Sequence, residues 1–237
     1  MYCELGRYPL YIRRNLRIFK FWLKIKNTNN CILKECYENM IVNNDSWIVN
    51  LKYELSSIGL EYLFEESSVN RVRDYKIIES RILDICKQNI MSSLSISPKC
   101  FLYQHLIDNF CNQSYLKRSI NVNAKKYITR FRTSSHSLNI EKGRHNNVLK
   151  SARICKLCHC NDIEDEFHFI LKCPFYTDFR KKFIKKFYYE KPSVFKLVML
   201  LSVENTKELN NLGKFLVYAM KRRNLALNLQ LNNLLNL

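Results

Sequence analysis

The chain has 237 residues, of which 39 are Lys or Arg and 21 are Asp or Glu, so its formal net charge is +18. This length allows one large domain or two small ones, each able to bury a core. So large a positive charge predicts a polyanionic partner, most simply nucleic acid. An anionic membrane surface is the competing interpretation.

The N-terminal residues do not resemble a secretory signal, because Met1 leads through Tyr2 and Cys3 into a basic stretch without an apolar core. The longest apolar run, residues 194–203, is interrupted by Lys196 and is too short to cross a bilayer. We therefore expect an intracellular protein, nuclear or cytoplasmic, with no membrane partner and with reduced cysteines. Six cysteines show no ligand spacing and are expected to be small apolar residues: Cys3, Cys31, Cys36, Cys86, Cys100 and Cys111.

Apolar residues at helical spacing predict a mainly α fold, and the four Gly and four Pro of the chain are too few for a sheet with many turns. Helices are expected first over residues 7–26, 31–40 and 47–58. Asp45 or Ser46 would cap the third of these. The first helix carries a basic face, either solvated or in contact with phosphates, made of Arg7, Arg13, Arg14, Arg17, Lys20, Lys24 and Lys26.

Further along the chain, the same spacing predicts a helix over residues 75–91, a linker over 92–98 and another helix over 101–110. A last helix is expected over residues 209–223, because the three cations at its end suit the negative end of the helix dipole. In the tail from residue 225, apolar and polar residues alternate as in a strand, but the tail is too long for one, and no structure is predicted for it.

The segment from residue 117 to residue 150 is the most one-sided in charge, with nine cations and one acid, Glu141. Tyr127 and Phe131 lie among the cations, and positive charge with interleaved aromatic rings is typical of a sequence-tolerant nucleic-acid surface. We expect its Ser- and Asn-rich part to include a loop that its partner orders. A second basic run, residues 180–186, alternates with phenylalanines expected to contact the core: Phe179, Phe183 and Phe187.

The candidate nucleic-acid-binding residues come from these two basic runs. They are Lys125, Lys126, Arg130, Arg132, His136, Arg144, Arg180, Lys181, Lys182, Lys185 and Lys186. His136, Glu141 and His145 neither share a helical face nor match a ligand pattern, so we expect them to support structure or contact RNA rather than to catalyse a reaction.

The spacing of Cys155, Cys158, His168 and Cys173 predicts a metal site. A Cys-x2-Cys pair forms a tight turn whose two thiolates point at one ion, and a later His and Cys complete a tetrahedron. Three thiolates and an imidazole are the ligands of closed structural zinc sites, so Zn²⁺ is the expected cofactor. A redox Cys-x-x-Cys is the other interpretation, but it requires a βαβ context that the chain does not show.

Between the two ligand pairs, Asp162 is expected to cap a short helix from which His168 faces the metal. Cys173 follows five positions later, too far round for the same helical face, so the helix should end there, before Pro174. His159 and Cys160 lie next to the first pair and could replace one of the four ligands. The choice among these candidates is open at this point.

Several stretches occur in an order that resembles the C-terminal region of non-LTR (LINE-like) retrotransposon reverse transcriptases of invertebrate animals. Residues 4–10 (ELGRYPL) with Phe21-Trp22, and residues 47–60, are similar to the segment after the polymerase domain. Residues 131–144 (FRTSSHSLNIEKGR) and 153–176 resemble the block before the zinc unit and the reverse-transcriptase zinc-binding domain itself. With this resemblance, the expected division is 1–95 (helical post-polymerase region), 96–150 (basic connector), 151–190 (CCHC zinc-binding domain) and 191–237 (C-terminal helices and tail).

The resemblance implies a zinc-dependent accessory region that binds RNA or DNA and works beside the polymerase portion of the same element. Polymerase chemistry needs clustered carboxylates that hold two magnesium ions. The acids Asp45, Asp74, Asp84 and Asp108 are scattered, so we expect no enzyme activity from this chain and regard it as a fragment or a truncated reading frame. The alternative function is a structural or protein-interaction zinc protein derived from such an element.

Overall fold

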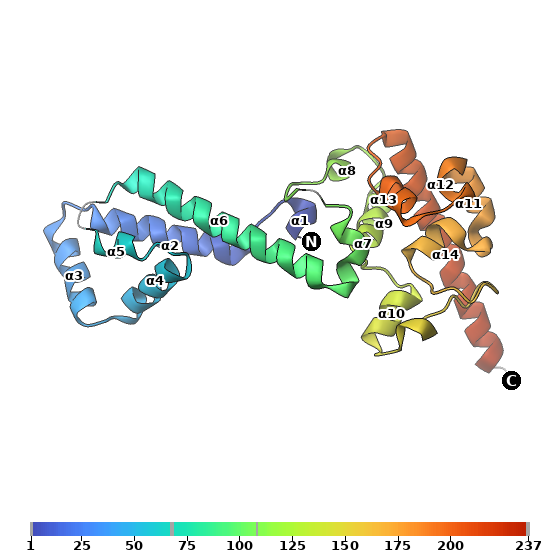
Figure 1. Cartoon of the computed structure of the whole chain (residues 1–237), viewed down its shortest axis with the longest axis horizontal. Coiled ribbons are helices and arrows are strands. Elements are labelled where there is room, and N and C mark those ends of the chain that lie inside the picture. Colours follow the sequence, from blue (N-terminus) through green and yellow to red (C-terminus); the bar gives the residue numbers. More distant parts are fainter. Residues whose placement is uncertain (1, 67–68, 108, 236–237) are drawn as a thin grey trace. The chain divides into compact units, whose positions relative to one another are not determined.

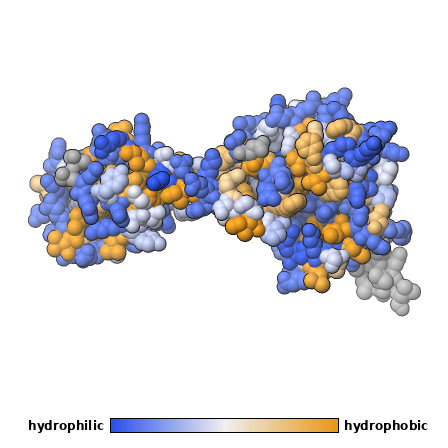
Figure 2. Space-filling model, viewed as in Figure 1, coloured by the Kyte–Doolittle hydropathy of each residue, from blue (hydrophilic) through white to orange (hydrophobic). Residues whose placement is uncertain are grey.

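A computed structural model describes residues 2–66, 69–107 and 109–235 of the chain (Figure 1). Across these residues the secondary structure is helical, with two isolated β-bridges and no strand, which confirms the predicted mainly α fold. Within the same ranges, no helix is both long enough and apolar enough to span a membrane. Figure 2 shows polar side chains over much of the surface in view, with apolar patches between them.

The chain divides into two compact units, each with its own hydrophobic core. The N-terminal unit comprises residues 6–93 together with Tyr2. The C-terminal unit comprises the residues from Leu94 onward and also residues 3–5, which lie in α1 (Tyr2–Leu5). A short segment near the start of the chain therefore belongs to the second unit.

The N-terminal unit packs its helices around Trp22, whose side chain is fully buried. The indole Nε1 donates to the Tyr37 hydroxyl at 2.9 Å, and the ring stacks on Phe64 with centroids 6.0 Å apart. As predicted, Asp45 caps the third long helix, because its side chain accepts from the Trp47 N–H at 2.8 Å. The helices of this unit are α2 (Leu10–Lys26), α3 (Cys31–Val42), α4 (Ser46–Ser57), α5 (Tyr62–Glu65) and α6 (Arg71–Ile96).

The linker predicted over residues 92–98 is wrong for most of its length, because α6 continues through Ile96. Serine is a weak helix breaker, and Ser93 bonds its hydroxyl to the Asn89 carbonyl at 2.8 Å within the helix. The break falls at Pro98, which begins the short 3-10 helix η1 (Pro98–Cys100). The helix expected over 101–110 is limited to α7 (Phe101–Gln104), and Asp108 lies outside the described residues.

The C-terminal unit is organised around α14 (Thr206–Leu235), which packs along α9 (Val122–Arg132) and α11 (Thr177–Phe183). Phe131, Phe169 and Phe215 form a buried aromatic series, with ring centroids 5.3 Å apart for the first pair and 6.2 Å for the second. The remaining helices are α8 (Ser114–Lys117), α10 (Asn139–His145), η2 (Lys150–Ala152), η3 (His168–Lys172), η4 (Pro174–Tyr176), α12 (Lys186–Glu190) and α13 (Val194–Leu201).

Two sequence predictions for the end of the chain need correction. The last helix does not end at residues 221–223 but continues to Leu235, and Arg223, expected at the helix end, is buried within the helix. Phe187 was expected in the core but is 54% exposed. Because α11 ends at Phe183 and α12 begins at Lys186, the helical register that aligned the phenylalanines is interrupted between them.

Candidate metal centre

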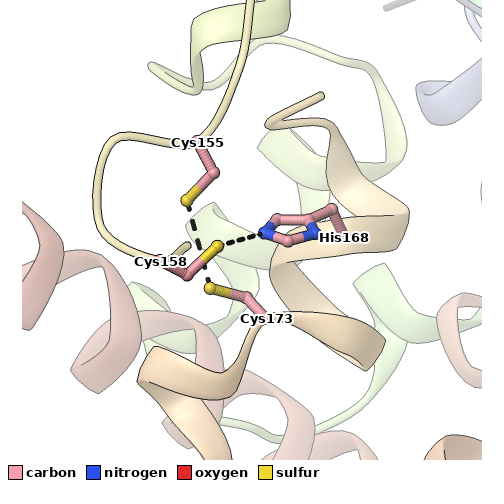
Figure 3. Close-up of side chains that lie close together, drawn as sticks. All are labelled: Cys155, Cys158, His168 and Cys173. Carbon is pink, nitrogen blue, oxygen red and sulfur yellow. Dashed lines mark hydrogen bonds between the residues drawn. The ribbon is translucent and has the colours of Figure 1, made fainter. Parts of the chain in front are cut away.

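A short hairpin presents the first ligand pair. Ile154 and Ile163 form an antiparallel bridge, and the Cys155 N–H donates to the Asp162 carbonyl at 2.9 Å. A second bond, from the Glu164 N–H to the Arg153 carbonyl at 2.9 Å, closes the base of the hairpin. These bonds hold both ends of the loop that carries Cys155 and Cys158, so the two thiol groups face the same space (Figure 3).

The second pair comes from a widened helical turn. The Cys173 N–H donates to the His168 carbonyl at 2.7 Å, which is the i to i+5 bond of a π-helix, and η3 is assigned as one. A π-turn takes more residues than an α-turn, so it brings Cys173 round to the side of His168. The helix ends at Cys173 as predicted, but the expectation that this residue lies too far round for the same face assumed α-helical geometry and is wrong.

The capping residue also differs from the prediction. Asp165, not Asp162, accepts a hydrogen bond from the His168 N–H, at 2.8 Å. Asp162 instead places its Oδ2 3.3 Å from His168 Nδ1, although this contact does not meet hydrogen-bond geometry. A carboxylate near the far nitrogen of a ligating histidine orients the ring and favours the tautomer that leaves the other nitrogen free to bind a metal.

The four predicted ligands converge (Figure 3). The Sγ atoms of Cys155, Cys158 and Cys173 and a ring nitrogen of His168 all lie within 4.8 Å of one another. Cys155 Sγ is 4.0 Å from Cys173 Sγ, and Cys158 Sγ is 3.3 Å from His168 Nε2. A disulfide needs sulfur atoms about 2.05 Å apart, so these thiols are unlinked. The group could hold a metal ion.

The electrostatics of the cluster favour an anionic sulfur. A hydrogen bond from Cys173 is the main cause that lowers the pKa of Cys155 to about 4. The same contact and burial raise the pKa of Cys173, and burial raises the pKa of Cys158 to about 11. Burial opposes the charged form of His168, but the neighbouring Cys155 and Asp162 outweigh it and raise the pKa of the imidazole. A divalent cation would compensate this negative charge.

The centre is fixed to the core of its unit. Phe169, next to His168, packs on Tyr176 with ring centroids 4.6 Å apart and continues the buried aromatic series described above. Arg180 donates from Nε to the Ile170 carbonyl and from Nη2 to the Cys173 carbonyl, each at 2.7 Å. This arginine therefore satisfies carbonyls at the end of the π-turn, which leaves the backbone around Cys173 well defined.

The two alternative ligands are excluded by position. His159 and Cys160 are exposed, and neither belongs to the group of converging ligand atoms in the described part of the chain. The quartet is therefore the one that the sequence spacing predicted.

Three candidate nucleic-acid-binding residues are buried, and this corrects their predicted role. Arg132 pairs with Glu4 through Nε and Oε1 at 2.7 Å and is 2% exposed. The His136 side chain is 1% exposed and contacts Glu166 Oε1 through Nε2 at 2.8 Å. Arg180 is held by the carbonyls named above. These side chains are used inside the fold, so they are not available to phosphates.

The other candidates lie at or near the surface, and several are already paired. Lys126, Arg130, Lys181 and Lys182 are exposed. Four are engaged within the fold: Lys125 bonds the carbonyls of Leu116 and Arg118, Arg144 pairs with Glu141, Lys185 with Glu208, and Lys186 with Glu190. His136 and Glu141 thus have separate partners within the fold, and His145 is exposed. The expectation that the trio supports structure or contacts RNA stays a prediction.

A cleft that the sequence did not indicate lies beside the hairpin. It has a volume of about 710 Å³ and is lined by residues of α10, the hairpin and α14. Lys142, Arg153 and Lys156 line it together with four asparagines, and the lining residues, all in the described part of the chain, include no acid. The one sequence signal for this cleft was the position of Lys156 between the candidate ligands Cys155 and Cys158. The approach of α14 to this wall could not be inferred from sequence spacing.

No protein-family model, curated protein or solved structure matches this chain. The resemblance to non-LTR reverse transcriptases is therefore still a hypothesis after these comparisons. What stands from the structure is a mainly α protein with a Cys3His group that could hold a metal ion.

Proposed function

We propose that this protein binds one zinc ion through Cys155, Cys158, His168 and Cys173 and uses the unit that the zinc stabilises to bind RNA or DNA. The observation that carries the proposal is the convergence of the four ligand atoms beside a cleft lined by cations. We further propose that the chain corresponds to the accessory region that follows the polymerase in a non-LTR retrotransposon reverse transcriptase, and that it performs no polymerase chemistry itself.

The ligand set supports zinc over other ions. Three sulfurs and one imidazole suit a borderline-soft ion in tetrahedral geometry and do not suit Mg²⁺ or Ca²⁺, which prefer oxygen. With Zn–S bonds of about 2.3 Å and Zn–N bonds of about 2.0 Å, a tetrahedron separates two sulfurs by about 3.8 Å and sulfur from nitrogen by about 3.5 Å. The distances of 4.0 Å and 3.3 Å between ligand atoms are close to these values.

All four coordination positions would be filled by protein side chains, so the ion would have a structural role. It would tie the hairpin, which carries Cys155 and Cys158, to the π-turn, which carries His168 and Cys173. The unit buries three of the four ligands, and a closed site of this kind supplies folding energy without an open position for a substrate.

The cleft supports nucleic acid as the ligand. Lys156 follows Cys155 directly, so a zinc ion that orders the hairpin would also position this ammonium group on the wall of the cleft. Arg153 is held there by bonds from Nε and Nη2 to the Val148 carbonyl at 3.0 and 2.7 Å. Lys142 adds a further charge, while the asparagine amides can both donate to and accept from base edges or sugars.

The test uses the full-length chain and two measurements. Metal analysis of the purified protein should give about one zinc per chain, and a content well below this contradicts the zinc assignment. Fluorescence anisotropy with short labelled RNA and DNA should show saturable binding. Over a series of salt concentrations, the logarithm of the association constant should fall linearly with the logarithm of the salt concentration.

A paired substitution then locates the binding. Lys142→Ala with Lys156→Ala should reduce the salt slope by about 1.4 to 1.8, the value expected for two lost phosphate contacts. The control is Lys191→Ala with Lys207→Ala, which removes the same charge from exposed positions outside the cleft. An unchanged slope in the cleft variant would mean that this wall does not bind nucleic acid. Absence of binding by any short RNA or DNA would instead favour a protein-interaction role. A polymerase reading frame directly upstream in the gene would support the proposed origin.

A further inference from the structure

The N-terminal unit carries a second basic surface, outside the candidate metal centre. It lies on the basic helix whose charged face the sequence left open as either solvated or in contact with phosphates. A groove of about 480 Å³ runs along α2, where Arg13, Arg14 and Arg17 line it together with Phe21, and Trp47 of α4 lines it as well. All three arginines are exposed, and Phe21 is 57% exposed. The groove therefore combines guanidinium groups with accessible aromatic surface within one unit.

The arginines that line the groove are not paired with neighbouring acids in the described part of the chain. The described residues that line the groove include no acid, and Arg13 and Arg17 form no ion pair within the described ranges. Arg14 is oriented, because its Nε and Nη2 each donate to Asn15 Oδ1 at 3.1 Å. Asn15 in turn donates to Glu54 Oε2 at 3.0 Å, which fixes the amide. One arginine is thus preorganised, and two remain available to an anion.

The rings of Phe21 and Trp47 do not stack on each other, so their faces are left for stacking on a ligand. Phe21 and Trp47 meet at 68° with centroids 6.3 Å apart, an edge arrangement rather than a parallel stack. More than half of the surface of Phe21 is exposed to solvent. Exposure of an apolar ring to water is not favourable in itself, and exposed apolar surface beside polar residues is typical of a binding site. Arginines that neutralise phosphates beside rings that stack on bases are the usual composition of a groove for single strands.

We propose that this groove binds single-stranded nucleic acid, with phosphates on Arg13 and Arg17 and an unpaired base against Phe21 and Trp47. The proposal goes beyond the function assigned to the zinc unit, because it concerns a separate unit and does not require the metal. A duplex would keep its bases stacked on one another, so the aromatic surface selects for single strands.

A membrane surface fits this face less well. A basic helix at a lipid interface inserts its apolar face into the bilayer. The apolar face of α2 is already committed to the core, since Phe19, Trp22 and Leu23 are at most 1% exposed. The guanidinium group, by contrast, matches phosphate geometry with two parallel hydrogen bonds. Charge and shape together favour the nucleic-acid strand.

The experiment measures binding of the zinc-loaded, full-length protein to a labelled single strand and to a duplex of the same length. Arg13→Ala with Arg17→Ala should reduce the salt slope for the single strand by about 1.4, and Phe21→Ala should weaken single-strand binding by about fivefold or more with little effect on the duplex. The control, Lys20→Ala with Lys24→Ala, removes two exposed cations from the same helix outside the groove and should change the slope less.

The outcomes separate this proposal from the function of the zinc unit. If the arginine variant binds the single strand like the parent, while the Lys142 and Lys156 variant is impaired, the groove proposal is overturned and the proposed function stands. If only the arginine and Phe21 variants are impaired, the groove binds and the cleft does not. Binding to phosphatidylserine vesicles that depends on Phe21, without any binding of single strands, would overturn the proposal in favour of a membrane surface.

Discussion

Glu4 and Arg132 lie 128 positions apart in the chain, yet Arg132 Nε donates to Glu4 Oε1 at 2.7 Å, and both side chains are at most 3% exposed. Tyr103 and Tyr115 donate their hydroxyls to the two oxygens of the same carboxylate, at 2.8 and 2.5 Å. The guanidinium also donates from Nη1 to the Leu201 carbonyl at 2.6 Å. Every charge in this buried group has a partner, so residues 3–5 form an integral part of the C-terminal unit.

Breaking this pair should be costly. Removal of one partner from a buried ion pair leaves an uncompensated charge, so Arg132→Ala is expected to lower the free energy of unfolding of the C-terminal unit by about 3–5 kcal/mol. Arg130→Ala, two residues earlier on α9 and exposed, should change it by less than about 0.5 kcal/mol. Urea denaturation followed by circular dichroism measures both. Similar stabilities for the two variants would show that the pair is not important for the fold.

The metal centre predicts a sharp contrast between neighbouring cysteines. If zinc binds as proposed, Cys158→Ser removes a ligand and should abolish stoichiometric zinc binding and unfold the hairpin and π-turn, since structural zinc sites contribute about 10–16 kcal/mol of apparent binding energy. Cys160→Ser, two residues away and outside the cluster, should keep full zinc content. Metal analysis and thermal denaturation compare the two proteins. Full zinc content in the Cys158 variant would disprove the assignment of the ligands.

The crossing of α9 and α14 depends on a glycine. A Cβ at Gly213 would lie 2.3 Å from the Cβ of Ala124 and 3.0 Å from its Cα. Gly213→Ala should therefore destabilise the protein by about 1–3 kcal/mol, because the crowding outweighs the better helix propensity of alanine. Adding Ala124→Gly removes the crowded atom and should restore a large part of this loss in urea denaturation. A more stable Gly213→Ala protein would mean that the helices separate without cost.

Alkaline pH should destabilise the C-terminal unit through its buried tyrosines. Burial, with the neighbouring Glu4 carboxylate adding to it, raises the pKa of Tyr103 and of Tyr115 far above the usual value of about 10. A group whose pKa is raised in the folded state stabilises that state fully below its unfolded pKa. This contribution is lost as pH rises beyond about 10, where the unfolded chain releases the protons.

The free energy of unfolding should accordingly fall between pH 9 and pH 11, and a protein with both Tyr103→Phe and Tyr115→Phe should show a shallower fall over that interval. The double variant is less stable at neutral pH because the Glu4 carboxylate loses two donors, so the comparison uses the slope with pH and not the absolute value. Equal slopes for the two proteins would exclude these tyrosines as the cause.

Local features of this protein were accessible from its sequence. The four residues that converge as candidate metal ligands followed from their spacing, because a Cys-x2-Cys turn and a following His and Cys define a site within a short segment. The helices α2, α3 and α4 and the Asp45 cap followed from apolar periodicity and capping chemistry, which act within a few residues. The π-turn did not, because its i to i+5 bond depends on how His168 and Cys173 are held by the rest of the site.

The tertiary structure decided which charges are inside. In the sequence, all three buried arginines belong to basic runs: Arg132 and Arg180 were expected to contact nucleic acid, and Arg223 was expected at the end of the last helix. Their partners are far along the chain or are backbone carbonyls: Glu4 for Arg132, the end of the π-turn for Arg180, and Glu164, whose Oε2 lies 2.6 Å from Arg223 Nη2. A guanidinium is stable in a core only when hydrogen-bond acceptors surround it, and residue spacing does not record which acceptors the fold brings together.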